Sequence, residues 1–184
     1  MPIKIADGLA AKEKLHDEGI FTIDKGLALH QDIRPLHILI LNLMPLKKPT
    51  ELQLLRLLGD SPLQVEVDFC HTEMHQSTHT DASYLDENYY VFEDIKDRYY
   101  DGLIITGAPV EQIPFESVDY WPEMKTYFDW AKTHAFSTLL FCWGAQAGLY
   151  HYYGIHKRDL SSKLFGNFEY QLTQKHHPLL RGFD

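Results

Sequence analysis

Three short apolar runs, each followed by a loop and a helical segment, constrain the fold of this chain more than any other feature. They cover residues 36–43 (LHILILNL), 102–106 (GLIIT) and 136–141 (FSTLLF). Continuous apolar runs of this length are typical of strands that are buried on both faces of a parallel sheet. Strands separated by helices predict a doubly wound α/β sheet with helices on both faces. In such sheets ligands bind beyond the carboxyl ends of the strands.

The segments between these runs carry their own patterns. Residues 50–53 (TELQ) match a capping box and predict a helix of about ten residues that stops at Gly59. Residues 63–69 (LQVEVDF) alternate as a half-exposed strand does, and residues 84–97 are predicted to be mostly helical. Apolar residues at helical spacing predict a further helix over residues 120–134.

The first 35 residues differ from the rest of the chain. They contain a polar, helical stretch at residues 7–18 and a short apolar piece at residues 21–23. We expect residues 1–35 to form an N-terminal arm that packs on a main domain over residues 36–184.

Charge and cysteine content argue against several classes of protein. The net charge is -9, and no basic run is longer than Lys47-Lys48, so nucleic-acid binding is not expected. That lysine pair is interpreted either as an aid to binding coenzyme A phosphates or as a solvated pair. No apolar run approaches the roughly 18 residues of a membrane span. Only two cysteines are present, Cys70 and Cys142, which favours a reducing cytoplasm over a secreted disulfide scaffold.

No bound metal is expected. His71, His75 and His79 repeat every four residues, but the segment lacks the apolar stripe of a helix. The sequence HTEMH is also not the His-Glu-x-x-His zinc motif.

Cys142 has the sequence context of a nucleophile. It comes directly after the third apolar run and is followed at once by residues 143–148 (WGAQAG), mostly small residues that open a helix. A tight turn from strand to helix exposes a side chain, and the helix N-terminus favours a thiolate. Its free N–H groups can bind an oxyanion, and the amide of Trp143 is the natural donor. The alternative is that Cys142 is a buried core cysteine. Cys70 lacks this sequence context and is interpreted as structural or incidental.

This segment resembles the nucleophile motif of the homoserine O-acyltransferases that are related to class I glutamine amidotransferases. The other motifs that resemble this family lie at residues 30–35 (HQDIRP), 40–45 (ILNLMP), 50–56 (TELQLLR), 102–111 (GLIITGAPVE), 118–121 (VDYW), 163–166 (KLFG) and 177–184 (HPLLRGFD). The resemblance covers essentially the whole chain. It implies a flavodoxin-like doubly wound sheet and a homodimer.

The resemblance also implies a ping-pong reaction. The Cys142 thiolate attacks the thioester of acetyl-CoA, coenzyme A leaves, and the hydroxyl of L-homoserine takes the acetyl group, an early step towards methionine. Acetyl-CoA is then a co-substrate, and no cofactor is expected. Four alternatives stay open: L-serine as acceptor, succinyl-CoA as donor, a glutamine-amidotransferase-like hydrolase, and a catalytically silent domain.

Two further residues take roles from the resemblance. Lys163 matches a lysine that contacts the amino-acid substrate, and Glu111 matches the position associated with the choice of acyl donor, with glutamate for acetyl-CoA and glycine for succinyl-CoA. A carboxylate there repels the free carboxylate of a succinyl group by up to about 4 kcal/mol at ~4 Å. The alternatives are a solvated lysine and an ordinary loop carboxylate.

The family's general-base histidine, its glutamate partner and a substrate-binding arginine are implied to lie beyond the position that matches Asp184. We therefore expect residues 36–184 to be a C-terminally incomplete acyltransferase domain.

Overall fold

The computed structural model describes residues 3–6, 8–28, 33–74, 80–162, 164–174 and 177. Its strands are β1 (Ile3–Ile5), β2 (Thr22–Asp24), β3 (Leu36–Leu41), β4 (Val65–Cys70), β5 (Tyr89–Tyr90), β6 (Tyr100–Ile105) and β7 (Ala135–Leu140). Its helices are α1 (Ala11–Asp17), α2 (Lys25–Ala28), α3 (Lys47–Gly59), α4 (Ala82–Asn88), α5 (Phe92–Ile95), the 3-10 helix η1 (Phe115–Ser117), α6 (Trp121–His134) and α7 (Cys142–Tyr153).

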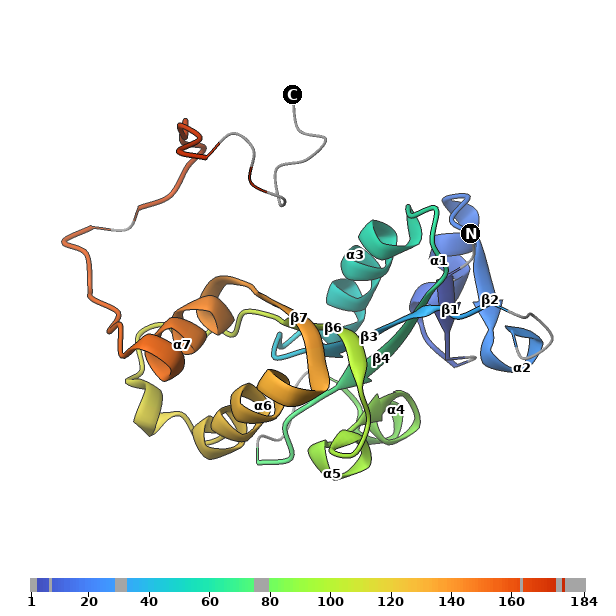
Figure 1. The fold of residues 1–184 in the computed structure, drawn as a ribbon, viewed down its shortest axis with the longest axis horizontal. Helices are drawn as coiled ribbons and strands as arrows, with labels where there is room; N and C mark the ends of the chain where they lie inside the picture. Colours follow the sequence, from blue (N-terminus) through green and yellow to red (C-terminus); the bar gives the residue numbers. More distant parts are fainter. Residues whose placement is uncertain are drawn as a thin grey trace.

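The strands form one open sheet in which the described pairs are all parallel. The order is β2-β1-β4-β3-β6-β7, and β5 pairs with β4 beyond the end of β1. Helices α1 and α3 pack on one face, and α5, α6 and α7 pack on the other (Figure 1). The prediction of a doubly wound, flavodoxin-like α/β sheet is therefore confirmed.

The N-terminal segment adds two strands to this sheet. β1 pairs with β4 on one side and with β2 on the other, and the boundary expected at residue 35 falls just before β3. With β1 and β3 on its two sides, β4 is a central strand, and five of its six residues are buried in the pattern BiBBBB. The prediction that this strand is half-exposed was wrong, because both faces of β4 are covered.

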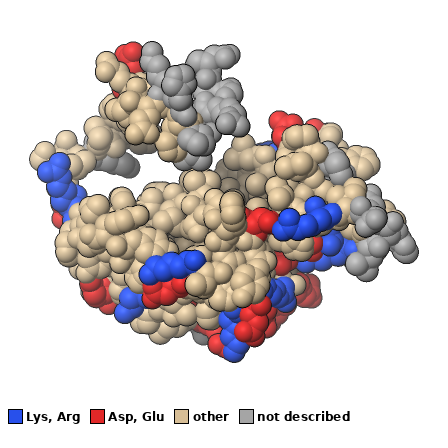
Figure 2. Space-filling model, in the orientation of Figure 1, with Lys and Arg blue, Asp and Glu red and all other residues tan. Residues whose placement is uncertain are grey.

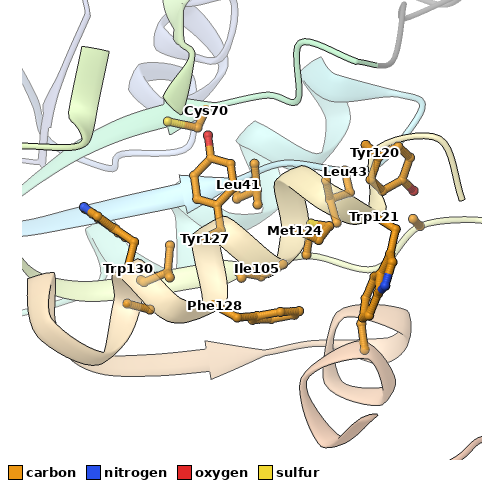
Figure 3. Close-up of a cluster of buried hydrophobic side chains, with 14 of the residues drawn as sticks. Leu41, Leu43, Cys70, Ile105, Tyr120, Trp121, Met124, Tyr127, Phe128 and Trp130 are labelled. Atoms are coloured by element: carbon orange, nitrogen blue, oxygen red, sulfur yellow. The ribbon is translucent and has the colours of Figure 1, made fainter. Parts of the chain in front are cut away.

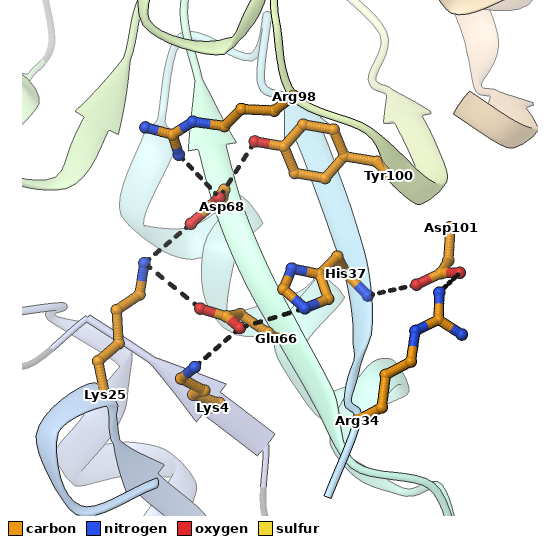
Figure 4. Close-up of polar contacts among 9 residues, drawn as sticks. All are labelled: Lys4, Lys25, Arg34, His37, Glu66, Asp68, Arg98, Tyr100 and Asp101. Atoms are coloured by element: carbon orange, nitrogen blue, oxygen red, sulfur yellow. Dashed lines mark hydrogen bonds and ion pairs between the residues drawn. The ribbon is translucent and has the colours of Figure 1, made fainter. Parts of the chain in front are cut away.

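Two carboxylates on β4 tie the N-terminal segment to the sheet (Figure 4). Asp68 accepts hydrogen bonds from Lys25 Nζ at 2.9 Å and from Tyr100 Oη at 3.1 Å, and Glu66 accepts one from Lys4 Nζ at 2.8 Å. Both carboxylates thus have a cationic partner, which offsets the cost of their burial.

The larger core lies between the sheet and α6 (Figure 3). Five side chains on one side of α6 are buried there, as the helical spacing predicted: Trp121, Met124, Tyr127, Phe128 and Ala131. They pack against Leu41 of β3 and Ile105 of β6. This packing fixes α6 against the sheet at the carboxyl ends of β3 and β6.

The helix predicted from residue 50 starts earlier and without a capping box. α3 begins at Lys47, and the Thr50 hydroxyl donates to the carbonyl of Leu46 at 3.0 Å. The Glu51 carboxylate accepts hydrogen bonds from the hydroxyls of Tyr84 and Tyr89. The capping-box prediction was wrong because α3 already begins at Lys47, so Thr50 lies within the helix and not at its N-cap.

Two other predictions need correction. Residues 84–97 are not one helix, because Tyr89–Tyr90 pairs with β4 and separates α4 from α5. β7 is not buried, because it is the last strand of the described sheet and only β6 pairs with it. Its Phe136 side chain is 93% exposed.

On the face shown in Figure 2, basic and acidic side chains lie together in small mixed groups. None of the helices in the described part of the chain is long and apolar enough to span a membrane.

Candidate active site

Cys142 occupies a strained turn between β7 and α7. It is the first residue of α7, its side chain is exposed, and its φ angle is 50°. Within the described residues, no other non-glycine residue has a left-handed backbone. This conformation costs an L-residue about 1–2 kcal/mol, and such strain is concentrated at functional sites. The strand, turn and helix expected around Cys142 are confirmed, whereas its role as nucleophile stays a prediction.

Two glycines allow the start of α7 to lie directly on the end of β6. A Cβ atom on Gly107 would lie 2.9 Å from Cβ and 3.2 Å from Sγ of Cys142. A Cβ atom on Gly144 would lie 2.6 Å from the carbonyl oxygen of Thr106. The indole of Trp143 is fully buried beneath this turn. The main-chain N–H of Trp143 belongs to the first turn of α7, where main-chain donors have no acceptor within the helix.

A cavity of ≈ 580 Å³ has Cys142 in its wall. The loop after β3 contributes Met44, the loop after β6 contributes Pro109 and Glu111, and α3 contributes Leu54 and Leu57. The chain leaves β3 for β4 on one side and returns to β6 on the other, so this cavity lies at the point where the strand order reverses. The structure thus brings Glu111 and Cys142, 31 positions apart in the sequence, to one cavity.

A second cavity of ≈ 520 Å³ adjoins the first. The two share Met44 and Pro109, and the second is also lined by Lys47, His71 and Asp119. Burial lowers the pKa of His71, while its hydrogen bond to the carbonyl of Thr72 acts in the opposite direction.

Lys47 is buried at the edge of this second cavity. Its side chain is 7% exposed, and its Nζ atom donates to the carbonyl oxygen of Asn42 at 2.6 Å. Burial lowers the pKa of Lys47 to about 8, and the nearby Glu51 carboxylate opposes that shift. The interpretation of Lys47-Lys48 as a solvated pair was therefore wrong for Lys47. Lys48 is exposed, with its ammonium 4.2 Å from the centre of the Tyr84 ring.

A buried hydrogen-bond network supports the loop after β3, and the sequence analysis missed it. Asn42 Nδ2 donates to Tyr89 Oη at 2.9 Å, and Tyr89 and Tyr84 donate to the two oxygens of Glu51 at 2.6 and 2.7 Å. Burial raises the pKa of Glu51, although the two tyrosine hydroxyls lower it. The one sequence signal was a polar residue, Asn42, inside the first apolar run.

The loops after β3 and β6 are joined directly. The Leu43 amide donates to Thr106 Oγ1 at 2.8 Å, and the Thr106 amide donates to the Leu41 carbonyl at 3.1 Å. These contacts hold the walls of both cavities in a fixed relation.

Lys163, His75 and His79 are outside the described residues. Within those residues, no group of three or more histidine, cysteine, aspartate or glutamate side chains is placed to hold a metal ion.

A known protein family and several known proteins match this chain along nearly its whole length. The sequence model of the family described as homoserine O-succinyltransferase matches residues 2–184. Similar proteins, each 55% identical over all 184 residues, are named homoserine O-acetyltransferase in Lachnoclostridium phytofermentans, Agathobacter rectalis and Clostridium acetobutylicum. The match covers 61%, 59% and 61% of these relatives, so the chain spans about three fifths of their length.

Proposed function

Because the chain belongs to the homoserine O-succinyltransferase family, we propose that it transfers an acetyl group from acetyl-CoA to the hydroxyl of L-homoserine, with Cys142 as the acyl carrier. The observation that carries this proposal is the strained, exposed Cys142 at the N-terminus of α7 in the wall of a largely apolar cavity. The relatives named homoserine O-acetyltransferase support it. The product is a precursor for methionine biosynthesis.

The proposed reaction has two steps. The Cys142 thiolate attacks the carbonyl carbon of the thioester, the bond to the coenzyme A sulfur breaks, and coenzyme A leaves as a thiolate that takes up a proton. The homoserine hydroxyl then attacks the acyl-cysteine, loses its proton, and releases the Cys142 thiolate. The Trp143 amide donates to the oxyanion in both steps. Lys163 binds the carboxylate of the amino acid. The acyl group is carried by the protein itself, so the proposal includes no cofactor.

Glu111 selects the donor in this proposal. It lies in the wall of the Cys142 cavity, where the acyl group of a bound thioester must lie. A carboxylate there disfavours the second carboxylate of a succinyl group and leaves room for acetyl. Four apolar residues in the same wall suit the apolar part of the donor: Met44, Leu54, Leu57 and Pro109.

We further propose that the protein acts as a cytoplasmic homodimer. Its two cysteines are both free, and Cys70 is buried in β4, which fits a reducing compartment. The resemblance to the family supports the homodimer.

Acylation of Cys142 tests the proposal without requiring a complete catalytic cycle. The purified chain is mixed with acetyl-CoA or succinyl-CoA at about pH 8.5, where a free thiol is about half ionised. Intact mass spectrometry then measures the addition of one acyl group, and peptide mapping locates it. Addition of L-homoserine or L-serine to the isolated acyl-protein shows which acceptor removes the group.

We expect one acetyl group on Cys142, faster loading from acetyl-CoA than from succinyl-CoA, and release by homoserine. The control is Cys142→Ala, which should stay unmodified although Cys70 is retained. If acetyl-CoA modifies the unsubstituted chain no faster than the Ala variant, the thioester route is wrong. Equal loading from the two donors would contradict only the role of Glu111 and would leave the thioester route standing.

A further inference from the structure

The loop that carries Glu111 is held by a lysine from a distant part of the chain. Lys157 follows α7, and its Nζ atom donates to the main-chain carbonyl of Glu111 at 2.6 Å and also to that of Ile113. A hydrogen bond from a cation to a carbonyl is stronger than a neutral one. Two such bonds from one ammonium group fix the main chain on both sides of residue 112.

The next turn of this loop packs on α7. The Lys157 ammonium lies 4.7 Å from the centre of the Phe115 ring. Phe115 stacks on Tyr150 of α7, with ring centres 4.8 Å apart, and its ring centre is 5.9 Å from that of Trp143. The Tyr150 hydroxyl also donates to Glu116. The loop is therefore anchored to the helix that begins with Cys142, and Lys157 supplies the contacts nearest Glu111.

Lys157 contacts the main chain of a residue that lines the Cys142 cavity, Glu111. Lys157 donates its hydrogen bond to the main-chain carbonyl oxygen of Glu111 and not to the carboxylate. Burial lowers the pKa of Lys157, and the carboxylates of Asp159, Glu111 and Glu116 act against that shift. The cation thus fixes the main chain at Glu111, a residue in the wall of the Cys142 cavity.

We propose that Lys157 is a positioning residue for the choice of acyl donor: it holds the main chain at Glu111 so that the carboxylate stands in the wall of the Cys142 cavity. This inference rests on the proposed function, because it assigns Lys157 a part in a selection that Glu111 performs. Without the two carbonyl contacts the loop can withdraw Glu111, and a succinyl group meets less repulsion.

The test compares three variants of the whole chain. Lys157→Met keeps the length of the side chain but removes the donors, Lys157→Arg keeps the charge and the donors, and Arg158→Met is the matched control at an exposed neighbour. The first readout is the ratio of Cys142 acylation rates from acetyl-CoA and succinyl-CoA. The second is hydrogen–deuterium exchange of the amides of residues 109–117.

We expect Lys157→Met to lower the acetyl-to-succinyl ratio by about tenfold, since a charge-assisted hydrogen bond is worth about that factor in an equilibrium constant. Exchange in residues 109–117 should rise in the same variant. Lys157→Arg should restore most of the ratio, and Arg158→Met should leave it unchanged. A general loss of structure would instead slow both donors equally and raise exchange throughout the chain.

Other results overturn the inference in distinguishable ways. If the unsubstituted chain is acylated by neither donor, the proposed function fails and this inference fails with it. If the unsubstituted chain prefers acetyl-CoA, and Lys157→Met keeps that ratio or raises it, only the role of Lys157 is wrong. Unchanged exchange in residues 109–117 would also contradict it.

Discussion

Lys47 holds an ammonium group in a place where burial disfavours the charge. Its pKa in the folded protein is about 8, against 10.5 for an ordinary lysine. Below about pH 8 both states carry the proton, and the folded state bears the full cost of the buried charge. Above that pH the folded state loses its proton first, so the unfolded state binds more protons and the free energy of unfolding rises with pH.

We expect the free energy of unfolding to rise by about 2 kcal/mol through Lys47 between about pH 7 and about pH 9.5. In Lys47→Met this contribution should vanish, so the two proteins should differ in the slope of stability against pH. Urea denaturation across that range measures the slope. Lys48→Met is the control, since Lys48 is exposed and should leave the slope as it is. A parallel slope for Lys47→Met and the parent chain would mean that Lys47 has an ordinary pKa.

Residue types and their order along the chain were enough to predict the position of Cys142 but not the environment of Lys47. The strand, the turn and the small residues after Cys142 are local, and local patterns can be read from one sequence. The burial of Lys47 depends on Glu51 and Asn42, and on Tyr89 from a distant segment. A lysine next to another lysine carries no sign of such a network.

The junction between β6 and α7 is the element contact on which the site depends most. In Gly144→Ala the new Cβ would meet the Thr106 carbonyl, a main-chain atom that cannot turn aside. We expect α7 to shift away from β6, with a loss of about 1–3 kcal/mol in the free energy of unfolding. Cys142 should also be acylated more slowly, because its turn moves with the helix.

Gly26→Ala is the matched control for this substitution. Gly26 lies in α2, and a Cβ there would meet nothing within 4 Å. Its stability should stay the same or rise by up to about 1 kcal/mol, because alanine favours a helix. Equal effects of the two substitutions, measured by urea denaturation, would contradict the close contact at Gly144.

Element types were predicted better than element surroundings. The apolar run at residues 36–43 and the helical spacing at residues 120–134 were confirmed as β3 and α6, because their periodicity is intrinsic. The run at residues 136–141 has the same character, yet β7 is exposed. A strand's composition shows what it can pack against, whereas its burial depends on which segments lie beside it. The capping box at Thr50 failed because α3 begins three residues earlier, at Lys47, and the Thr50 hydroxyl donates to the Leu46 carbonyl.

At the scale of the whole molecule, both cavities lie where the loops after β3 and β6 part. At this edge of the sheet, Met44 and Pro109 line both cavities. Glu111 and Cys142 line the first cavity, and Lys47 lines the second. The sheet does this because its strands are parallel, so that every loop at this edge follows a strand. Sequence order alone predicted which loops meet, and the packing of the loops decides which side chains share a cavity.

Strand β7 forms one side edge of the described sheet. Within the described residues β7 pairs only with β6, and Phe136 on it is 93% exposed. Unpaired main-chain groups beside an exposed aromatic ring favour association with another chain, and a charged residue on such an edge opposes it.

We expect the 184-residue chain to self-associate as its concentration rises, and Phe136→Lys to raise the dissociation constant by about tenfold or more. Sedimentation equilibrium measures this constant. Leu27→Lys, at a leucine of α2 that is 64% exposed, is the control for a general loss of hydrophobic surface and should leave the constant unchanged. Because Phe136 is almost fully exposed, its replacement should change the free energy of unfolding by no more than about 0.5 kcal/mol. If both lysine variants weaken association equally, the contact is not at β7, and another surface brings the chains together.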